Sequence, residues 1–272
     1  MGVNSKLTYL GWSSFVIEAE NGTLLFDPFY RKMCGVTWSR LEDVKDAKVI
    51  CVTHGHAEHY VDVPDILNAT DAVVVGSKEV CGHLNTKYKV KKERLRPINC
   101  LEEISVSGFK ITAFEFGHRE VSTLRFLKEG FLRANLIPVL RYAWLNLLNS
   151  PPSTPFHGFF VEGPDNLRLM NYCEGFSDVL KIEEIRNLAQ RFKIDLLLAG
   201  IQLDFEEYVA QGVSALSPKT VILFHPHEAL FEKVGLKSST AQTFADKISE
   251  LSPEVNIIIA NPQKSYTTSL LD

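Results

Sequence analysis

The sequence predicts an α/β protein whose functional residues lie at the ends of β-strands. Short β-prone runs separated by turn residues open the chain, and strand-like and helix-like runs alternate through its second half. In both halves, histidines and carboxylates follow apolar strand-like runs. Loops at strand ends are where rigid scaffolds commonly present chemistry. We therefore expect the site to be assembled from several such loops.

The first half reads as a β-meander followed by single strands and short helices. The opening runs are separated by Gly11-Trp12-Ser13 and by the turn dipeptide Asn21-Gly22, and Pro28 cannot continue the ladder after Asp27. Asp27 is either a turn cap or part of the site. The expected strands are 7–10, 14–19, 23–27, 49–52, 72–75, 103–106 and 109–116, and the expected helices are 63–67 and 78–84.

The second half alternates strands and helices without an internal repeat or a low-complexity segment. Its first two strands are expected to form a hairpin around a Gly-Pro-Asp-Asn turn. The expected strands are 156–162, 167–172, 194–199, 220–224 and 256–260, and the expected helices are 178–192, 206–216 and 240–251.

Three histidines and a carboxylate stand within six residues, directly after the strand 49–52. They are His54, His56, Glu58 and His59. Neutral imidazole and carboxylate are ligands of zinc and other first-row cations, and one loop can wrap a cation only when its ligands are this closely spaced. The alternative is a solvated loop that happens to be rich in histidine. We favour the metal site because four such groups coincide.

Three further candidates follow strands elsewhere in the chain. His118 stands at the tip of one β-run, Glu174 follows another, and His225 ends a third. A lone histidine is more often structural, but a metal site needs ligands from distant parts of the chain. The histidine cluster therefore makes His118 a candidate ligand.

Composition and charge exclude several classes of protein. The 272 residues are 45% hydrophobic, enough to fill a substantial core, and the net charge of -4 argues against general nucleic-acid binding. Five cysteines without a Cys-x-x-Cys spacing suggest neither a disulfide framework nor a thiolate zinc site, and point to a reducing compartment. No signal peptide is visible at the start of the sequence, so we expect a cytoplasmic location.

Residues 121–148 differ from the rest of the chain. They are crowded with Leu, Phe, Ile and Trp but are interrupted by four basic residues, so no charge-free span of about 18 residues exists for a membrane-spanning helix. Gly130 and Pro138 suggest two or three short helical pieces, followed by a Pro-rich return at 151–155. Three interpretations stay open: a helical subdomain on the core, a lid over the site, or a surface that contacts lipid. A homo-oligomer also stays open.

An ordered series of motifs resembles the metallo-β-lactamase superfamily and, within it, the branch of ascorbate-6-phosphate-lactonase-like hydrolases. The matching segments span nearly the whole chain: 10–15, 26–29, 54–59, His118, 172–175, 194–198 and 218–225. The resemblance implies a four-layer αββα sandwich, in which two mixed β-sheets are flanked by helices and the metals lie at one edge. It also implies one domain over 1–272, with a hydrophobic helical insertion at about 121–155 that lies outside the match.

Carried over by position, the resemblance implies one or two divalent metal ions, with zinc as first choice and manganese or iron as alternatives. The implied ligands of the first metal are His54, His56 and His118, and those of the second are Glu58, His59 and His225, with Glu174 bridging.

Three positions depart from the pattern of the branch. The family usually has aspartate where this sequence has Glu58 and Glu174, and relatives of the branch often have histidine where it has Trp12. Both carboxylate changes fall on the second metal. Because metal geometry tolerates only a few tenths of an ångström, they put its occupancy or identity in question.

The ligand set predicts hydrolysis by a metal-activated water, which Glu58 would orient or deprotonate. No Gly-x-Ser-x-Gly elbow or Walker-type glycine loop supports a serine nucleophile or a nucleotide triphosphatase. The expected substrate is a small molecule with an ester, lactone or phosphodiester bond. The apolar insertion favours a substrate with a hydrophobic, lipid-like portion. The alternatives are a non-catalytic member that binds a metal or ligand and, ranked last, an iron-based redox enzyme.

Overall fold

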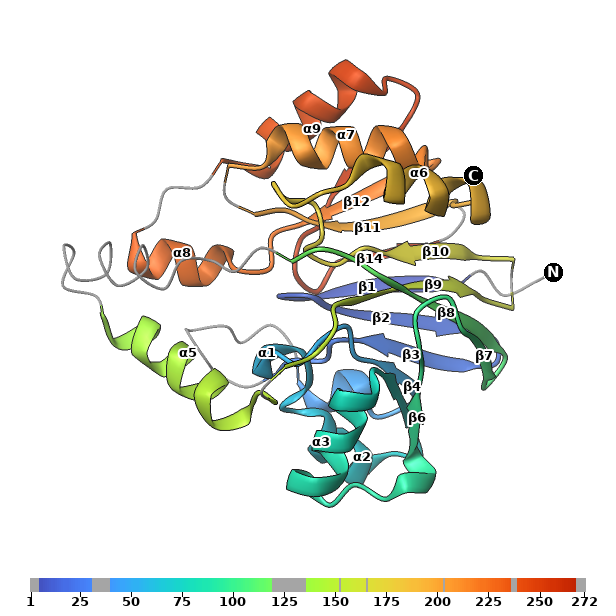
Figure 1. Ribbon diagram of the computed structural model, residues 1–272, viewed down its shortest axis with the longest axis vertical. Helices are drawn as coiled ribbons and strands as arrows, with labels where there is room; N and C mark the ends of the chain where they lie inside the picture. The colour runs from blue at the N-terminus through green and yellow to red at the C-terminus, as the bar shows by residue number, and fades with distance from the viewer. Residues whose placement is uncertain are drawn as a thin grey trace.

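The protein is a four-layer αββα sandwich, as the resemblance implied (Figure 1). Within the part of the chain that the structure describes, two seven-stranded sheets pack face to face and helices cover both outer faces. Both sheets are mixed, with antiparallel and parallel pairs. The computed structural model describes residues 5–30, 40–118, 136–151, 153–164, 166–202, 204–235 and 239–267.

The first sheet has the strand order β14-β1-β2-β3-β4-β5-β6. The meander β1–β3 is antiparallel, whereas β3 to β6 run parallel. From Val49 to Cys51, β4 is buried on both faces, which explains why the sequence there reads as an apolar run instead of an alternating one. The bounds are β1 (Lys6–Gly11), β2 (Ser14–Ala19), β3 (Gly22–Phe26), β4 (Ala47–Cys51), β5 (Val73–Gly76), β6 (Leu95–Pro97) and β14 (Ser265–Thr267).

The second sheet has the order β13-β12-β11-β10-β9-β8-β7. Strands β7 to β10 are antiparallel, and β10 to β13 are parallel. The predicted hairpin is the pair β9 and β10. The bounds are β7 (Glu103–Val106), β8 (Phe109–Glu115), β9 (His157–Glu162), β10 (Arg168–Asn171), β11 (Leu196–Gly200), β12 (Thr220–Phe224) and β13 (Asn256–Ile259).

The helices fall into three groups. One group packs on the outer face of the first sheet and a second on the outer face of the second sheet, while a third lies beside the edge where the site is found (Figure 1). These groups are α2 (Val63–Ala69) and α3 (Lys78–Tyr88); α6 (Ile182–Arg191), α7 (Glu206–Leu216) and α9 (Ala241–Leu251); and α1 (Ala57–Tyr60), α5 (Leu136–Asn149) and α8 (Glu228–Val234). Two 3₁₀ turns lie at Leu41–Val44 and Lys92–Arg94.

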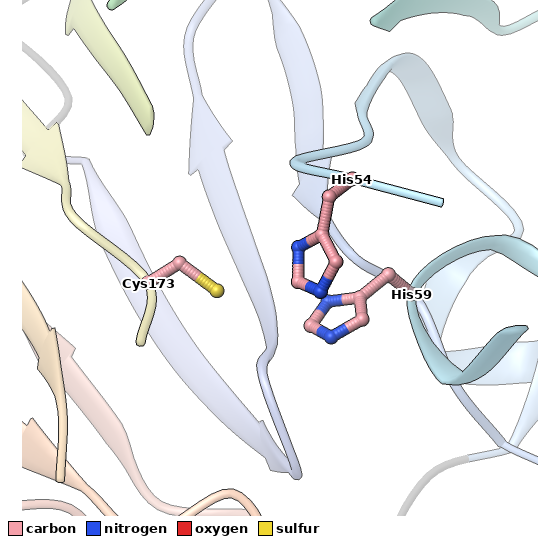
Figure 2. A group of neighbouring side chains, drawn as sticks. All are labelled: His54, His59 and Cys173. Carbon is pink, nitrogen blue, oxygen red and sulfur yellow. The ribbon is translucent and has the colours of Figure 1, made fainter. Parts of the chain in front are cut away.

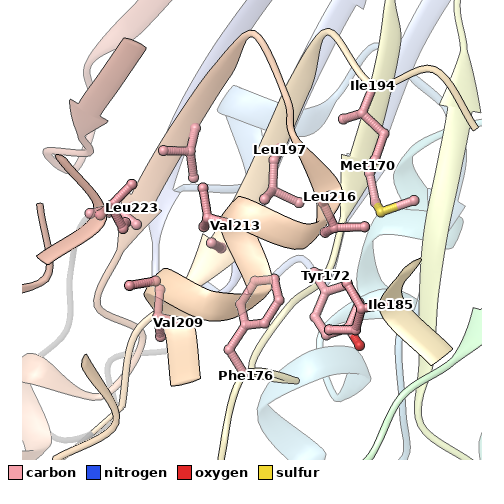
Figure 3. Close-up of a cluster of buried hydrophobic side chains, with 14 of the residues drawn as sticks. Met170, Tyr172, Phe176, Ile185, Ile194, Leu197, Val209, Val213, Leu216 and Leu223 are labelled. Carbon is pink, nitrogen blue, oxygen red and sulfur yellow. The ribbon is translucent and has the colours of Figure 1, made fainter. Parts of the chain in front are cut away.

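Three apolar layers hold the sandwich together. Between the sheets, aromatic residues such as Phe15 and Phe159 are fully buried. Outside the second sheet, Val209 and Val213 of α7 pack over the strands (Figure 3). Burial of this kind contributes roughly 1.5–3 kcal/mol for each large side chain. The sheets therefore form a rigid frame for the loops at their edge.

The structure differs from the sequence prediction mainly in short elements. The strand β6, which begins in the segment 87–96 with its six basic residues, and the elements α8 and β14 were not predicted, because runs of three to seven residues carry little periodicity. The helix expected at 178–192 begins only at Ile182. Because Pro138 lies in the first turn of α5, where the missing N–H costs little, it does not break that helix. Residues 119–135 of the insertion lie outside the described residues.

Among the described residues, the helices are all too short or too polar to cross a bilayer. The expectation of one domain over the whole chain stays a prediction.

The close packing of α7 can be tested with a pair of glycines. A Cβ on Gly212 would come within 2.3 Å of the buried Phe176 ring, whereas a Cβ on Gly82 of α3 would meet nothing within 4 Å. We expect Gly212→Ala to lower the free energy of unfolding by about 1–3 kcal/mol through overpacking. Gly82→Ala should raise it by roughly 0.4–1 kcal/mol, because alanine restricts the unfolded chain. Equal effects of the two substitutions on urea unfolding would contradict this packing.

Candidate metal centre

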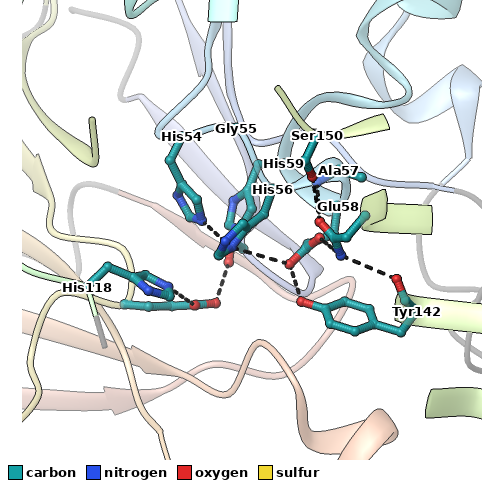
Figure 4. A network of polar contacts seen from close by, with 12 residues as sticks. His54, Gly55, His56, Ala57, Glu58, His59, His118, Tyr142 and Ser150 are labelled. Carbon is teal, nitrogen blue, oxygen red and sulfur yellow. Dashed lines mark hydrogen bonds and ion pairs between the residues drawn. The ribbon is translucent and has the colours of Figure 1, made fainter. Parts of the chain in front are cut away.

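The candidate site lies where segments of both sheets end at one edge. The histidine loop follows β4 of the first sheet, and three more segments follow β8, β10 and β12 of the second sheet. Figure 4 shows His118 facing the imidazoles of His54 and His56 from across this edge. The strand ends therefore bring together residues up to 173 positions apart, from His54 to His227, as the contacts below show.

Three imidazoles form the centre of the site. One ligand atom each from His54, His56 and His118 lies within 4.8 Å of the others, and His54 Nε2 is 3.0 Å from His56 Nδ1. Within the described part of the chain, His118 Nδ1 and His59 Nε2 are buried without a hydrogen-bond partner. Buried ring nitrogens without a partner cost free energy, and a bound cation would satisfy such atoms. The donor set therefore fits a divalent metal ion.

A hydrogen-bond network fixes the orientation of two of these rings. The Thr53 hydroxyl donates to Asp27 Oδ2 at 2.7 Å, and the same carboxylate oxygen lies 3.0 Å from His59 Nδ1. Because the Thr53 hydroxyl gives its proton to Asp27, it accepts from His54 Nδ1 at 3.0 Å. This network assigns the protons of His54 and His59 to Nδ1. Both rings therefore present Nε2 to a cation.

Asp27 also determines the charge state of His59. Burial alone would lower the pKa of His59, but the adjacent Asp27 carboxylate raises the pKa to about 9. Asp27 accepts a hydrogen bond from the proton on His59 Nδ1. A cation that binds Nε2 would therefore displace only the proton on Nε2. Asp27, which the sequence left open as a turn cap, thus orients a candidate ligand.

Cys173 lies beside the same rings but is a poor candidate ligand. One atom each from His54, His59 and Cys173 lies within 4.8 Å of the others, and Figure 2 shows the sulfur pointing towards the two rings. The Thr53 hydroxyl, however, already lies 3.7 Å from Cys173 Sγ and 3.0 Å from His54 Nδ1. Burial, reinforced by nearby carboxylates, raises the pKa of the thiol well above its usual value. Since a metal binds the thiolate, Cys173 is better placed to pack against the network.

Glu174 connects the two sides of the site. Its carboxylate lies 3.4 Å from His118 Nε2 and 3.7 Å from His227 Nδ1, and it accepts from Ser13 Oγ and Gln202 Nε2 at 3.3 Å. Burial would raise the pKa of this carboxyl, but His227 and the other imidazoles lower it far below its usual range. An ionised carboxylate between two imidazoles has the position expected of a bridging ligand.

Glu58 is held by the insertion. Tyr142 Oη donates to Glu58 Oε1 and Asn146 Nδ2 donates to Oε2 at 3.1 Å, both from α5. Oε1 also lies 3.9 Å from His56 Nδ1. Burial would raise the pKa of Glu58, but the imidazoles around it, first His56, outweigh burial and lower it. Glu58 is therefore an ionised carboxylate at the edge of the histidine cluster (Figure 4).

His225 is not part of any group of possible ligands found among the described residues. Its ring lies 5.6 Å from that of Phe231, a ring that His227 also approaches, at 5.7 Å. Among the described residues, His225 Nδ1 is also buried without a hydrogen-bond partner, and burial and His227 lower the pKa of His225 to about 4. His227, two residues later, is the imidazole that approaches Glu174. The resemblance pointed to His225, although the His225-Pro226-His227 sequence offered both histidines.

The structure thus brings together six of the seven predicted ligands and adds residues that the sequence did not single out. His54, His56, Glu58, His59, His118 and Glu174 lie around one centre. The added residues are those that orient or contact them: Thr53, Tyr142, Asn146, His227, Ser13 and Gln202. Their individual roles as metal ligands stay predictions.

Three residues beside the site have a left-handed backbone although none is glycine. Trp12, Asp27 and Cys173 have φ values of 52°, 42° and 49°. Each directly follows a strand or lies within two residues of one, at the edge where the candidate ligands meet. Non-glycine residues adopt this conformation rarely, and they often do so at functional sites, where the surrounding structure holds them.

Comparison with known proteins agrees with this geometry. The family model described as the metallo-beta-lactamase superfamily matches residues 10–124. Over those residues, the chain is similar to the metallo-β-lactamase superfamily. It is 35% identical, over 118 residues, to a UPF0173 metal-dependent hydrolase of Methylocella silvestris, an alignment that covers 43% of this chain and 50% of that protein. The chain thus aligns with only half the length of that relative.

Two further proteins match this chain over most of their length. A UPF0173 metal-dependent hydrolase of Methanopyrus kandleri is 22% identical over 264 residues, which is 96% of this chain and 99% of that protein. The fold is similar to that of Igni18, a metallo hydrolase from Ignicoccus hospitalis, with a TM-score of 0.70 at 17% identity and coverage of 97% and 98%. The narrower lactonase-like branch stays a prediction.

We expect substitution of the two histidines after β12 to have different effects on metal binding. Because His227 Nδ1 lies 3.7 Å from the Glu174 carboxylate, we expect His227→Ala to lower the metal-to-protein ratio by about one equivalent at the second position. We expect His225→Ala to leave the ratio unchanged. Elemental analysis of both variants after equilibration with zinc measures this. The reverse result would return the ligand role to His225.

Proposed function

We propose that the chain is a metal-dependent hydrolase that cleaves an ester, lactone or phosphodiester bond of a small molecule. The observation that carries this proposal is the convergence of His54, His56 and His118 on one centre, beside ionised Glu58 and Glu174. Relatives named metal-dependent hydrolases support the same activity. The site offers imidazole and carboxylate atoms to a cation, with no thiolate among the favoured ligands.

The residues would hold one or two cations, which we propose to be zinc, with manganese or iron as alternatives. His54 Nε2, His56 and His118 suit the first position. His59 Nε2 and Glu58 suit the second, with Glu174 between the two and a histidine of the segment after β12 beside it. A cation bound there lowers the pKa of a water molecule and polarises the bond that is attacked.

The chain's own groups supply the remaining chemistry. Glu58 is ionised and hydrogen-bonded, so it can orient a water molecule or accept a proton from it. Glu174 is also ionised and can balance the charge of a cation. The Cys173 thiol is buried and neutral, so it is not a nucleophile. We therefore assign the proton-accepting role to Glu58.

A second candidate function is metal or ligand binding without turnover. The observation in its favour is that both oxygens of Glu58 already accept hydrogen bonds from α5. Each carboxylate oxygen has a second acceptor position, so these bonds leave room for a water molecule or a cation. Turnover measurements distinguish the two functions.

We also propose a substrate with a hydrophobic portion. The outward face of α5 exposes Ile137, Leu140, Trp144, Leu147 and Leu148, each at least half exposed. Exposed apolar patches commonly mark contact with a ligand, a partner or a lipid surface. This face could receive a lipid-like part of the substrate or make peripheral contact with a membrane. A cytoplasmic location and a homo-oligomer stay predictions of the sequence.

The proposed activity predicts a specific effect of Glu58→Gln. The amide keeps the size of the side chain but cannot accept a proton, so turnover should fall by about 10²–10⁴-fold while the protein stays folded. The measurement uses the zinc-loaded protein and a panel of esters, lactones and phosphodiesters with short and long acyl chains.

Two results of that panel would contradict the proposal. Unchanged turnover in Glu58→Gln would remove Glu58 from the chemistry. Absence of turnover in a wild-type protein that binds zinc, across the whole panel, would favour the non-catalytic alternative.

A further inference from the structure

We infer that α5 contributes two positioning residues to the site, Tyr142 and Asn146, which orient the carboxylate of Glu58. This inference rests on the proposed function, because it concerns how a residue of that site is held. It also changes the interpretation of the insertion. The face of α5 that carries Tyr142 and Asn146 contacts Glu58 and Ala57, so the described part of the insertion contributes to the metal centre.

The two donors lie one helical turn apart and bind different oxygens of Glu58. Tyr142 Oη donates to Oε1 and Asn146 Nδ2 donates to Oε2. Residues four apart on a helix project from the same face, so a single face of α5 presents both groups. Two hydrogen bonds to opposite oxygens fix the plane of the carboxylate, which one bond would leave free to rotate.

Asn146 is itself locked in orientation. Its Oδ1 accepts from the backbone N–H of Ala57 at 2.9 Å and from Ser150 Oγ at 2.8 Å. Because an oxygen must face these donors, the amide NH₂ must face Glu58. Ala57 is the first residue of α1, the short helix that carries Glu58 and His59. Asn146 therefore fixes both the candidate ligand and the start of the helix that bears it.

Tyr142 is fixed through its ring. The ring lies parallel to that of Trp12, with centroids 6.1 Å apart and an interplanar angle of 24°. It also meets the His227 ring edge-on at 6.2 Å. Trp12 is fully buried and follows β1, so it belongs to the rigid frame. The hydroxyl of Tyr142 is thus held in place by aromatic packing from both sheets.

The length of the Glu58 side chain supports the inference. Trp12 and Glu58 both contact Tyr142 of α5. An aspartate at position 58 would be shorter by one carbon–carbon bond, about 1.5 Å. Hydrogen bonds tolerate only a few tenths of an ångström, so aspartate could not keep both donors. The longer glutamate suits the distance to α5.

Contacts away from the site anchor α5 independently of Glu58. Tyr88 of α3 donates to Asn149 Oδ1 at 2.8 Å, and Lys87 and Tyr60 donate to backbone carbonyls at the same end of α5. Removing one hydroxyl at Tyr142 should therefore leave the helix docked. Tyr88→Phe provides a matched control, since it removes a tyrosine hydroxyl bonded to the same helix but distant from Glu58.

The test compares the zinc affinity of Tyr142→Phe and Tyr88→Phe, measured by competition with a chromophoric chelator. Tyr142→Phe keeps the ring beside Trp12 and removes only the donor. We expect it to weaken binding of the second zinc equivalent by about 10–100-fold, the usual effect of losing a group that orients a ligand. Tyr88→Phe should leave both equivalents unchanged. Thermal unfolding should shift by a similar small amount in the two variants.

A double-mutant cycle of Glu58 and Tyr142, measured as zinc affinity, distinguishes a positioning role of Tyr142 from a purely structural one. If the length of the Glu58 side chain is what lets it accept hydrogen bonds from α5, Glu58→Asp by itself already loses the hydrogen bond from Tyr142. Adding Tyr142→Phe to Glu58→Asp should then change zinc affinity little further. Additive effects would show that the two residues act independently and would overturn the inference.

The remaining outcomes separate this inference from the proposed function. If Tyr142→Phe and Tyr88→Phe weaken zinc binding equally, α5 only packs against the site and the inference is overturned. Unchanged or tighter zinc binding in Tyr142→Phe would overturn the inference while leaving the metal centre intact. A wild-type protein that binds no zinc would overturn the metal centre and the inference together.

Discussion

The paired hydrogen bonds from Thr53 to Asp27 are the interaction on which the site depends. Thr53 donates through its backbone N–H at 2.8 Å and through its hydroxyl at 2.7 Å, and both residues are fully buried. These bonds join the end of β3 to the end of β4 and leave the Thr53 hydroxyl to accept from His54. A buried carboxylate without such partners would be costly, so the network also holds the strand ends together.

The site is a property of the whole sandwich and not of one sheet. The first sheet supplies the histidine loop and Asp27, whereas the second supplies His118, Glu174 and His227. Neither sheet alone brings imidazoles to both sides of a cation. The insertion completes the arrangement, because α5 reaches across the edge to hold Glu58. A helix that lies in the sequence between β8 and β9 thus contacts a candidate ligand that follows β4.

The sequence predicted the features that are local in the chain. The strand ends and the histidine cluster follow from apolar runs, turn residues and residue spacing, whereas the four-layer arrangement was implied only by the family resemblance. The roles of Thr53, Tyr142 and His227 could not be predicted, because they arise from contacts between distant segments, such as that between Glu58 and Tyr142, which are 84 positions apart. The choice between His225 and His227 depends on the path of a short segment after β12. No periodic pattern specifies such a path.

Anomalous diffraction from crystals grown with zinc tests the central claim most directly. The account predicts a peak bonded to His54 Nε2, His56 and His118, and a second peak bonded to His59 Nε2, with the Glu174 carboxylate between the two. The Nδ1 atoms of His54 and His59 should still face Thr53 and Asp27. A peak bonded to the Cys173 sulfur, or no peak among the imidazoles, would contradict the account.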